Sequence, residues 1–185
     1  MKGMKGTKER IALALPTIGK TLGRTNIYSL PRLVKVVVSS GTGRAKDKHR
    51  NAHVADRLAK ITGQKASPRA AKTSIASFKL REGETIGYAV TLRGTRMYGF
   101  LDKLIHAALP RTKDFKGIAP TGIDEVGNLT LGIKEHIIFP ETADEEQNDI
   151  LGLAVTIVTT AKNRAEARLV FDAIGIPFKK TTPAR

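Results

Sequence analysis

Two glycine-containing patterns have residue types that bind nucleotide phosphates. Gly19-Lys20-Thr21 matches the end of a P-loop, but the position where the motif needs its first glycine is Ala14. Gly41-Thr42-Gly43 is a lone glycine pair, and Lys46 stands where a dinucleotide-binding loop needs a third glycine. We therefore expect neither pattern to form a nucleotide site. The second is expected to be a turn whose free N–H groups are able to meet a phosphate.

Histidine and acidic side chains supply two further patterns, typical of metal sites. His49 and His53 have the spacing of zinc ligands on a helix, but Arg50 occupies the place of the catalytic glutamate. The acidic run Asp144-Glu145-Glu146 lacks the glycine and the alternating oxygen ligands of a calcium loop. No serine or cysteine nucleophile motif is present. The sequence therefore predicts no enzyme, no metal and no cofactor.

Positive charge is the strongest signal in the 185-residue sequence. The net charge is +15, and residues 1–100 hold 21 Lys and Arg against 5 Asp and Glu. A field of this size favours a polyphosphate partner over a merely solvated basic face. Cysteine is absent, which excludes disulfides, and no apolar run approaches the roughly 20 residues of a membrane span. We expect a nucleic-acid-binding protein of the cytoplasm with no membrane partner.

Hydrophobic periodicity indicates helices alternating with short strands. A tight turn, Glu82-Gly83-Glu84, joins two of the expected strands as a hairpin. Asn163 and Glu166 have the spacing of a helix N-cap and its reciprocal partner, and Gly175 ends that helix. The expected helices are 7–22, 47–61, 95–109 and 163–175, and the expected strands are 33–38, 73–81, 85–93, 129–133, 136–139 and 153–160.

This order predicts an α+β fold with an open, mostly antiparallel sheet and helices packed on one face. We expect one RNA-binding domain over residues 1–178, followed by a short basic tail at 179–185. The second face of the sheet is then free to meet a ligand. The basic side chains Lys72, Lys79 and Arg81 lie on or near the expected hairpin.

Between Pro31 and Phe178 the chain carries motifs that are weak singly and specific in their combined order and spacing. They include Gly63-Gln64-Lys65, Ser77-Phe78-Lys79-Leu80-Arg81-Glu82-Gly83, Val90-Thr91-Leu92-Arg93-Gly94, Ala108-Leu109-Pro110-Arg111, Asp114-Phe115-Lys116-Gly117, Ile133-Lys134-Glu135-His136-Ile137-Ile138-Phe139-Pro140-Glu141 and Thr159-Thr160-Ala161-Lys162. Together they resemble the bacterial-type ribosomal protein L5 family. The resemblance implies a structural protein of the large subunit, located in the central protuberance. The implied partners are 5S rRNA, large-subunit rRNA, P-site tRNA and neighbouring ribosomal proteins, and an organellar ribosome stays open as the location.

The resemblance also implies rRNA contacts at Gln64, Phe78, Thr91 and the end of the first strand, here Ser39. An amide bonds base or ribose edges, an aromatic ring stacks on an unpaired base, and a hydroxyl bonds a 2′-OH or a phosphate. Three cationic neighbours, Lys79, Arg81 and Arg93, are expected to pair with phosphates. Where the family usually has Asn, Ser39 is shorter and lacks the amide.

The implied tRNA-facing loop falls on residues 67–76, with Arg69, Lys72, Thr73 and Ser74 as the expected contacts. This loop is less basic than the usual family sequence, which predicts a weaker contact with tRNA.

Phe78 has two opposed interpretations. Strand alternation would place it on the face of Ala76 and Leu80, inside a core, whereas the resemblance implies that its ring meets RNA. We expect stacking. Two other functions remain open from the residues alone: a nucleic-acid-binding module outside the ribosome, and an NTPase acting through Gly19-Lys20-Thr21.

Overall fold

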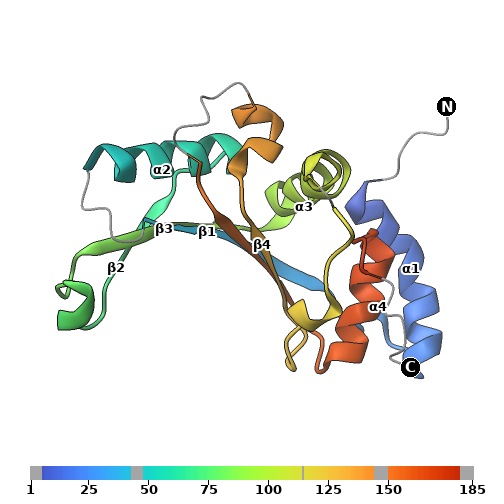
Figure 1. The fold of residues 1–185 in the computed structure, drawn as a ribbon. Helices are drawn as coiled ribbons and strands as arrows, with labels where there is room; N and C mark the ends of the chain where they lie inside the picture. Colours follow the sequence, from blue (N-terminus) through green and yellow to red (C-terminus); the bar gives the residue numbers. More distant parts are fainter. Residues whose placement is uncertain (1–5, 43–47, 114, 144–149, 180–185) are drawn as a thin grey trace, which may run out of the picture. The chain divides into compact units, whose positions relative to one another are not determined.

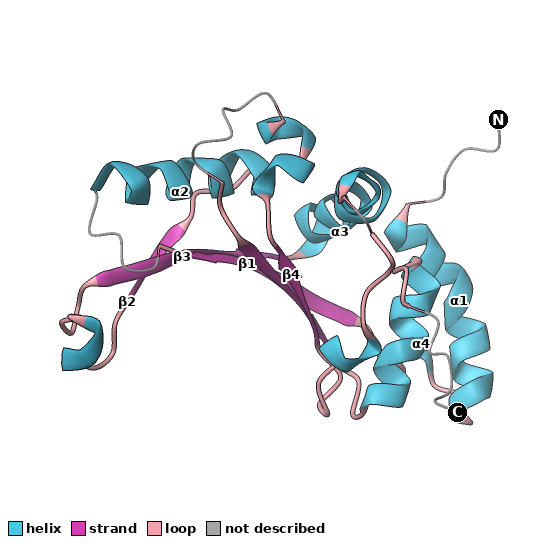
Figure 2. Ribbon diagram, in the orientation of Figure 1, coloured by secondary structure: helices cyan, strands magenta, loops and turns pink. Residues whose placement is uncertain are grey.

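The computed structural model describes residues 6–42, 48–113, 115–143 and 150–179. Gly43, the acidic run 144–146 and the tail residues 180–185 lie outside the described residues. The main helices and strands, shown in Figures 1 and 2, are α1 (Thr7–Leu22), β1 (Leu33–Gly41), α2 (Lys48–Thr62), β2 (Ser67–Ala70), β3 (Thr85–Leu92), α3 (Gly94–Lys103), β4 (Leu129–Ile133), β5 (Leu153–Thr159) and α4 (Arg164–Ile174).

The five strands form one open sheet in the order β2-β3-β1-β5-β4. The sheet is mostly antiparallel, and the predicted α+β class is confirmed. The chain divides into two compact units. Unit 1 comprises residues 1–36, 93–131 and 156–185, and unit 2 comprises 37–92 and 132–155. The predicted domain boundary at residue 178 stays a prediction.

In unit 1, a side chain from another helix caps the start of α1. The N-cap residue, Gly6, has no side chain to accept the free N–H groups of the first turn. Instead, Asp102 Oδ1 on α3 accepts both the Thr7 N–H and the Thr7 hydroxyl, each at 2.6 Å. Pro16 lies within α1 and does not end it. The core of the unit includes Phe171 and Ile174 of α4, both fully buried.

In unit 2, α2 packs against β3, as Figure 1 shows. The helix buries Val54, Leu58 and Ile61, which recur at helical spacing as the sequence predicted. Gly63, with φ of +67°, ends the helix in a conformation that costs glycine little. This helix and the buried Val90 of β3 give the unit an apolar core.

The predicted strand over 73–81 is wrong. The strand that pairs with β3 is β2, in an antiparallel register that places Arg69 opposite Gly87. The resemblance implied a loop from residue 67 onward, but β2 is the edge strand of the sheet, where Pro68, a residue without an N–H, is tolerated. The hairpin therefore exists, with a different first strand and a long connection.

The predicted strand over 136–139 is also wrong, because this segment is a short 3₁₀ turn. His136 is buried there, and its Nδ1 accepts the Leu151 N–H at 3.2 Å. Its carbonyl oxygen accepts the Thr142 hydroxyl at 2.9 Å. These bonds to Leu151 and Thr142 take the place of those of a strand ladder. No described helix is long and apolar enough to span a membrane.

Candidate nucleic-acid interface

The connection between β2 and β3, residues 71–84, is called the arm here. It extends beyond the end of the β2–β3 pair (Figure 1). At its base, the Ala71 N–H donates to the Glu84 carbonyl at 2.9 Å. Further out, Ser74 Oγ accepts the Glu82 N–H at 2.9 Å. The arm is therefore an ordered hairpin-like extension.

The tip of the arm is a turn closed by two backbone bonds between Ile75 and Leu80, at 3.1 and 3.2 Å. Inside it, a 3₁₀ turn over Ala76–Phe78 leads to Lys79, whose φ of 52° and ψ of 35° are left-handed. Among the described residues, Lys79 is the sole non-glycine with positive φ. Such a residue costs roughly 1–2 kcal/mol, and strain of this kind clusters at functional sites.

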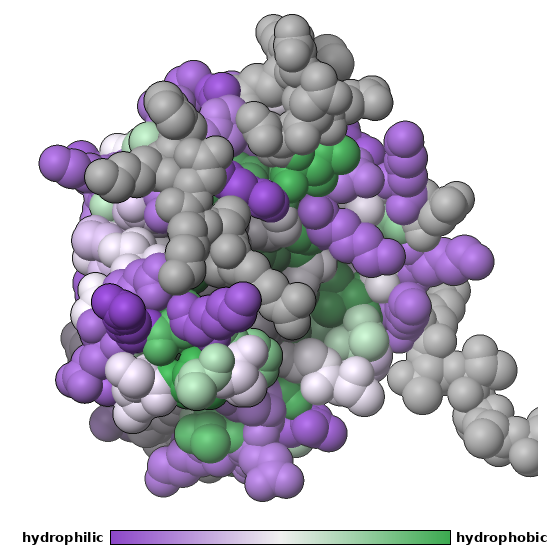
Figure 3. All heavy atoms as spheres, turned by 60° about the vertical axis from the view of Figure 1, so that its left-hand side comes forward, coloured by the Kyte–Doolittle hydropathy of each residue, from purple (hydrophilic) through white to green (hydrophobic). Residues whose placement is uncertain are grey.

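Phe78 belongs to this turn and not to a strand, so alternation does not apply to it. It is 55% exposed, so the core position that strand alternation favoured, the alternative to the expected stacking, does not hold. Ile75, at 41% exposed, is a second apolar residue of the tip, and sequence reasoning missed it. The side of the molecule on which the arm lies is mostly hydrophilic with small hydrophobic areas (Figure 3). The exposed ring of Phe78 is therefore available for stacking on a base.

The amide of Gln64, just after α2, lies beside the far end of β3. Its Nε2 donates to the Thr91 carbonyl at 3.4 Å, so the structure brings these two predicted residues together. Ser39 lies near the end of β1 and is half-buried. Because Ser40 is buried and donates its hydroxyl to the Gly152 carbonyl at 2.7 Å, Ser39 faces the opposite side of the sheet.

The predicted rRNA contacts therefore form two groups within unit 2. Phe78, Lys79 and Arg81 lie on the arm, and Gln64 and Thr91 lie at the other end of β3. From the base of the arm to Thr91 the strand runs about 20 Å, at about 3.3 Å per residue. Arg93, by contrast, is an exposed residue of unit 1, at the N-cap of α3.

The predicted tRNA contacts divide between β2 and the arm. Arg69 lies on β2, and Lys72, Thr73 and Ser74 lie on the first half of the arm. All four are exposed. Ser74 also has a structural part, since its hydroxyl oxygen accepts the Glu82 N–H.

The phosphate and metal patterns have other uses in the fold. Gly19-Lys20-Thr21 lies inside α1, so it forms no phosphate-binding loop. The His53 Nε2 accepts a hydrogen bond from Arg57 Nε at 3.3 Å, and the side chain of His49 lies outside the described residues. Among the residues that the structure describes, no group of three His, Asp or Glu side chains is placed to hold a metal ion.

Comparisons with known proteins agree with this picture. Residues 26–81 match the family model of ribosomal protein L5, and residues 85–178 match the model of the ribosomal L5 family C-terminus. The large ribosomal subunit protein uL5 of Flavobacterium johnsoniae is 49% identical over 94% of this chain and 93% of its own length. The corresponding protein of Prochlorococcus marinus strain MIT 9211 is 47% identical over 90% and 93%. The chain therefore belongs to the ribosomal protein L5 family, and is a non-enzymatic structural constituent of the large ribosomal subunit that associates with ribosomal RNA.

Proposed function

We propose that this chain binds 5S rRNA through unit 2, and that β2 and the first half of the arm contact P-site tRNA. The observation that carries the proposal is the tip of the arm, where an exposed Phe78 is followed directly by a cation in a strained conformation, Lys79. A ring beside cations suits a single-stranded nucleotide, because the base stacks and its phosphate pairs with the ammonium group.

The charges on the arm favour this use. Lys72, Lys79 and Arg81 are exposed. Of the two acidic residues, Glu84 turns back along the chain, where its Oε2 accepts the Arg81 N–H at 3.2 Å. That carboxylate is committed to the base of the arm. Glu82 is exposed beside Arg81, and the tip, residues 75–80, carries one charge, the cation of Lys79.

The group at the far end of β3 supplies polar contacts. The Gln64 amide uses one N–H on the Thr91 carbonyl and keeps its carbonyl oxygen and second N–H for a ligand. Thr91 carries a hydroxyl that bonds a ribose 2′-OH, a group that DNA lacks. Ser39 supplies a second hydroxyl from the end of β1, next to the start of β3, where the Thr42 N–H donates to the Ile86 carbonyl at 3.1 Å. A ligand that uses both groups spans about 20 Å, which favours a folded RNA over a single nucleotide.

The tRNA contact is supported by position and charge. Arg69 is exposed on an edge strand, and Lys72 follows it at the start of the arm. Both cations are therefore available to a phosphate backbone.

The test compares the full chain binding to 5S rRNA and to a DNA duplex of equal length, and it includes the Phe78→Ala variant. We expect the wild type to prefer 5S rRNA. We expect Phe78→Ala to weaken 5S binding by about 1–3 kcal/mol. Its thermal stability should change by less than about 0.5 kcal/mol, because the ring is exposed.

Val126→Ala is the matched control, since Val126 is an exposed apolar residue of unit 1. It should leave 5S affinity unchanged. Equal affinity of the wild type for the DNA duplex would refute the 5S assignment. Unchanged 5S affinity of Phe78→Ala would remove the arm from the interface.

A further inference from the structure

Unit 1 also displays a large aromatic side chain to solvent. Ile27 and Tyr28 form a 3₁₀ turn with Ser29, after the N-cap Asn26, and this segment is called the 26–29 turn here. Tyr28 is 90% exposed and Ile27 63% exposed. Single exposed apolar residues need no explanation, but two adjacent large ones on an ordered turn indicate a contact surface.

Three side-chain hydrogen bonds, added to two backbone bonds, hold the 26–29 turn in one shape. Asn26 Oδ1 accepts the Tyr28 N–H at 2.9 Å, and the Ser29 hydroxyl donates to the Asn26 carbonyl at 2.6 Å. From the end of α1, Arg24 Nη1 donates to the Ser29 carbonyl at 3.1 Å. Tyr28 is therefore presented on a fixed backbone, which lowers the entropy cost of binding a partner.

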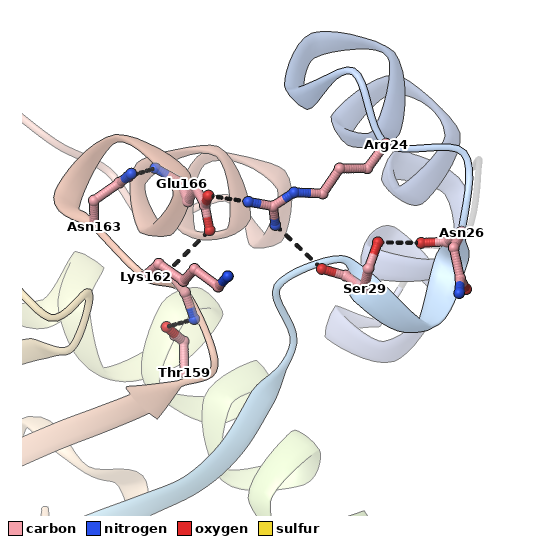
Figure 4. Close-up of polar contacts among 8 residues, drawn as sticks. Arg24, Asn26, Ser29, Thr159, Lys162, Asn163 and Glu166 are labelled. Carbon is pink, nitrogen blue, oxygen red and sulfur yellow. Dashed lines mark hydrogen bonds and ion pairs between the residues drawn. The ribbon is translucent and has the colours of Figure 1, made fainter.

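Arg24 in turn connects the 26–29 turn to the start of α4, as Figure 4 shows. Its Nη2 pairs with Oε1 of the buried Glu166. The same glutamate accepts the Lys162 N–H at 3.2 Å through Oε2, and its own N–H donates to the Asn163 cap at 2.8 Å. The turn that carries Tyr28 is therefore linked, through Arg24 and Glu166, to the packed interior of unit 1.

The chain segment that contains the turn carries charge of one sign. Between Arg10 and Asp47 the sequence contains no acidic residue, and Lys20, Arg24 and Arg32 flank the turn. The side chain of Lys162 extends from the start of α4 toward the turn (Figure 4). The nearby carboxylate of Glu166 is buried and paired with Arg24. An aromatic ring on a segment whose charges are all cationic suits a polyphosphate chain such as RNA.

We propose that Tyr28 is a further RNA-contacting residue, on which an unpaired base of ribosomal RNA stacks while Arg32 and Lys162 meet its flanking phosphates. Ile27 extends the apolar surface beside the ring. This contact lies in unit 1 and does not depend on the proposed 5S contact of unit 2.

The test places a photo-crosslinking benzoylphenylalanine at position 28 of the full chain. The chain is assembled into large ribosomal subunits, irradiated, and the crosslinked partner identified. We expect a crosslink to an rRNA nucleotide, and primer extension on the 5S rRNA and on the large rRNA distinguishes the two sources. A crosslink to a ribosomal protein, or none at all, overturns the proposal.

Affinity for large subunits depleted of this protein gives a second readout. Tyr28→Ala should rebind roughly 5- to 150-fold more weakly, the loss expected for one stacked base, while Tyr28→Phe keeps the ring and should rebind like the wild type. Leu13→Ala, which removes an exposed apolar side chain of α1, is the matched control and should rebind normally. Tyr28→Ala rebinding as tightly as that control would overturn the proposal, as would an equal loss in Tyr28→Phe.

Discussion

The arm of unit 2 and the 26–29 turn of unit 1 each display an aromatic ring on a 3₁₀ turn, and they hold it by different means. The arm relies on backbone hydrogen bonds, such as the Ile75–Leu80 pair, and accepts a left-handed Lys79. The 26–29 turn has two backbone bonds of its own, and side chains reinforce it, since Asn26 and Arg24 bond its backbone directly. Arg24 also reaches the buried Glu166.

The two turns should therefore differ in whether a substitution alters RNA binding alone or also the stability of the fold. Because the arm is closed by its own backbone, changes at its tip should alter RNA binding and leave the fold of unit 2 intact. The shape of the 26–29 turn depends on Arg24, which pairs with the buried Glu166, so changes at Arg24 should alter the free energy of unfolding of the chain. A free energy of unfolding measured beside an RNA affinity separates the two cases.

Removing Arg24, which supports the 26–29 turn, should have the largest effect on the free energy of unfolding. Arg24→Ala leaves the buried Glu166 carboxylate without its cation, and Arg24 is itself partly exposed. We expect a loss of about 2–3 kcal/mol in the free energy of unfolding, at or below the low end for broken buried ion pairs. In a chain of this length that lowers the melting temperature by about 5–10 °C. Urea and thermal denaturation measure both quantities.

Lys60→Ala is the control for Arg24→Ala, because it breaks an exposed pair with Asp56 whose atoms lie 3.2 Å apart. Such pairs contribute about 0.3–0.5 kcal/mol. Equal losses in the two variants would show that burial of Glu166 adds nothing. Below its melting temperature, Arg24→Ala should keep wild-type 5S affinity if RNA binding by the arm is independent of Arg24.

At the arm, Lys79→Gly and Lys79→Ala separate strain from charge. Both remove the ammonium group, but only glycine adopts the left-handed conformation freely. We expect Lys79→Gly to be more stable than Lys79→Ala by about 1 kcal/mol. For both variants, the slope of log 5S affinity against log salt should become shallower by up to about one unit. An unchanged slope would place Lys79 away from the RNA, and equal stabilities would contradict the strain at this residue.

The helices and the central strands were predictable because their patterns are long and periodic. The cap at Asn163 was also predicted correctly, although the reciprocal bond of Glu166 goes to the Lys162 N–H and not to the cap itself. β2 was missed because Pro68 is a turn signal in the sequence and is acceptable only at a sheet edge. A four-residue edge strand gives no periodicity of its own.

The turns that carry Phe78 and Tyr28 could not be predicted from sequence patterns. No glycine or asparagine marks the left-handed position at Lys79, so the turn at the tip of the arm was read as a strand. Family resemblance named Phe78 despite that reading, whereas Tyr28 belongs to no pattern that the sequence reveals. The turn that presents it is bonded by Arg24, which pairs with Glu166, a residue more than 130 positions further along the chain.

A third turn, Asp124 to Asn128, gives the smallest expected effect and a dependence on pH. Asp124 Oδ1 accepts the Asn128 N–H at 2.6 Å, and this bond holds the pKa of the exposed Asp124 carboxyl below its ordinary value of 3.8. Because the folded state favours the ionised form, this stabilisation is present above the unfolded pKa and is lost as pH falls through the folded one. Asp124→Asn should therefore cost less than about 0.5 kcal/mol near pH 7. The gap to the wild type should shrink below pH 3.8, whereas a gap that widens on acidification, or one matched by the control Glu125→Gln, would contradict this account.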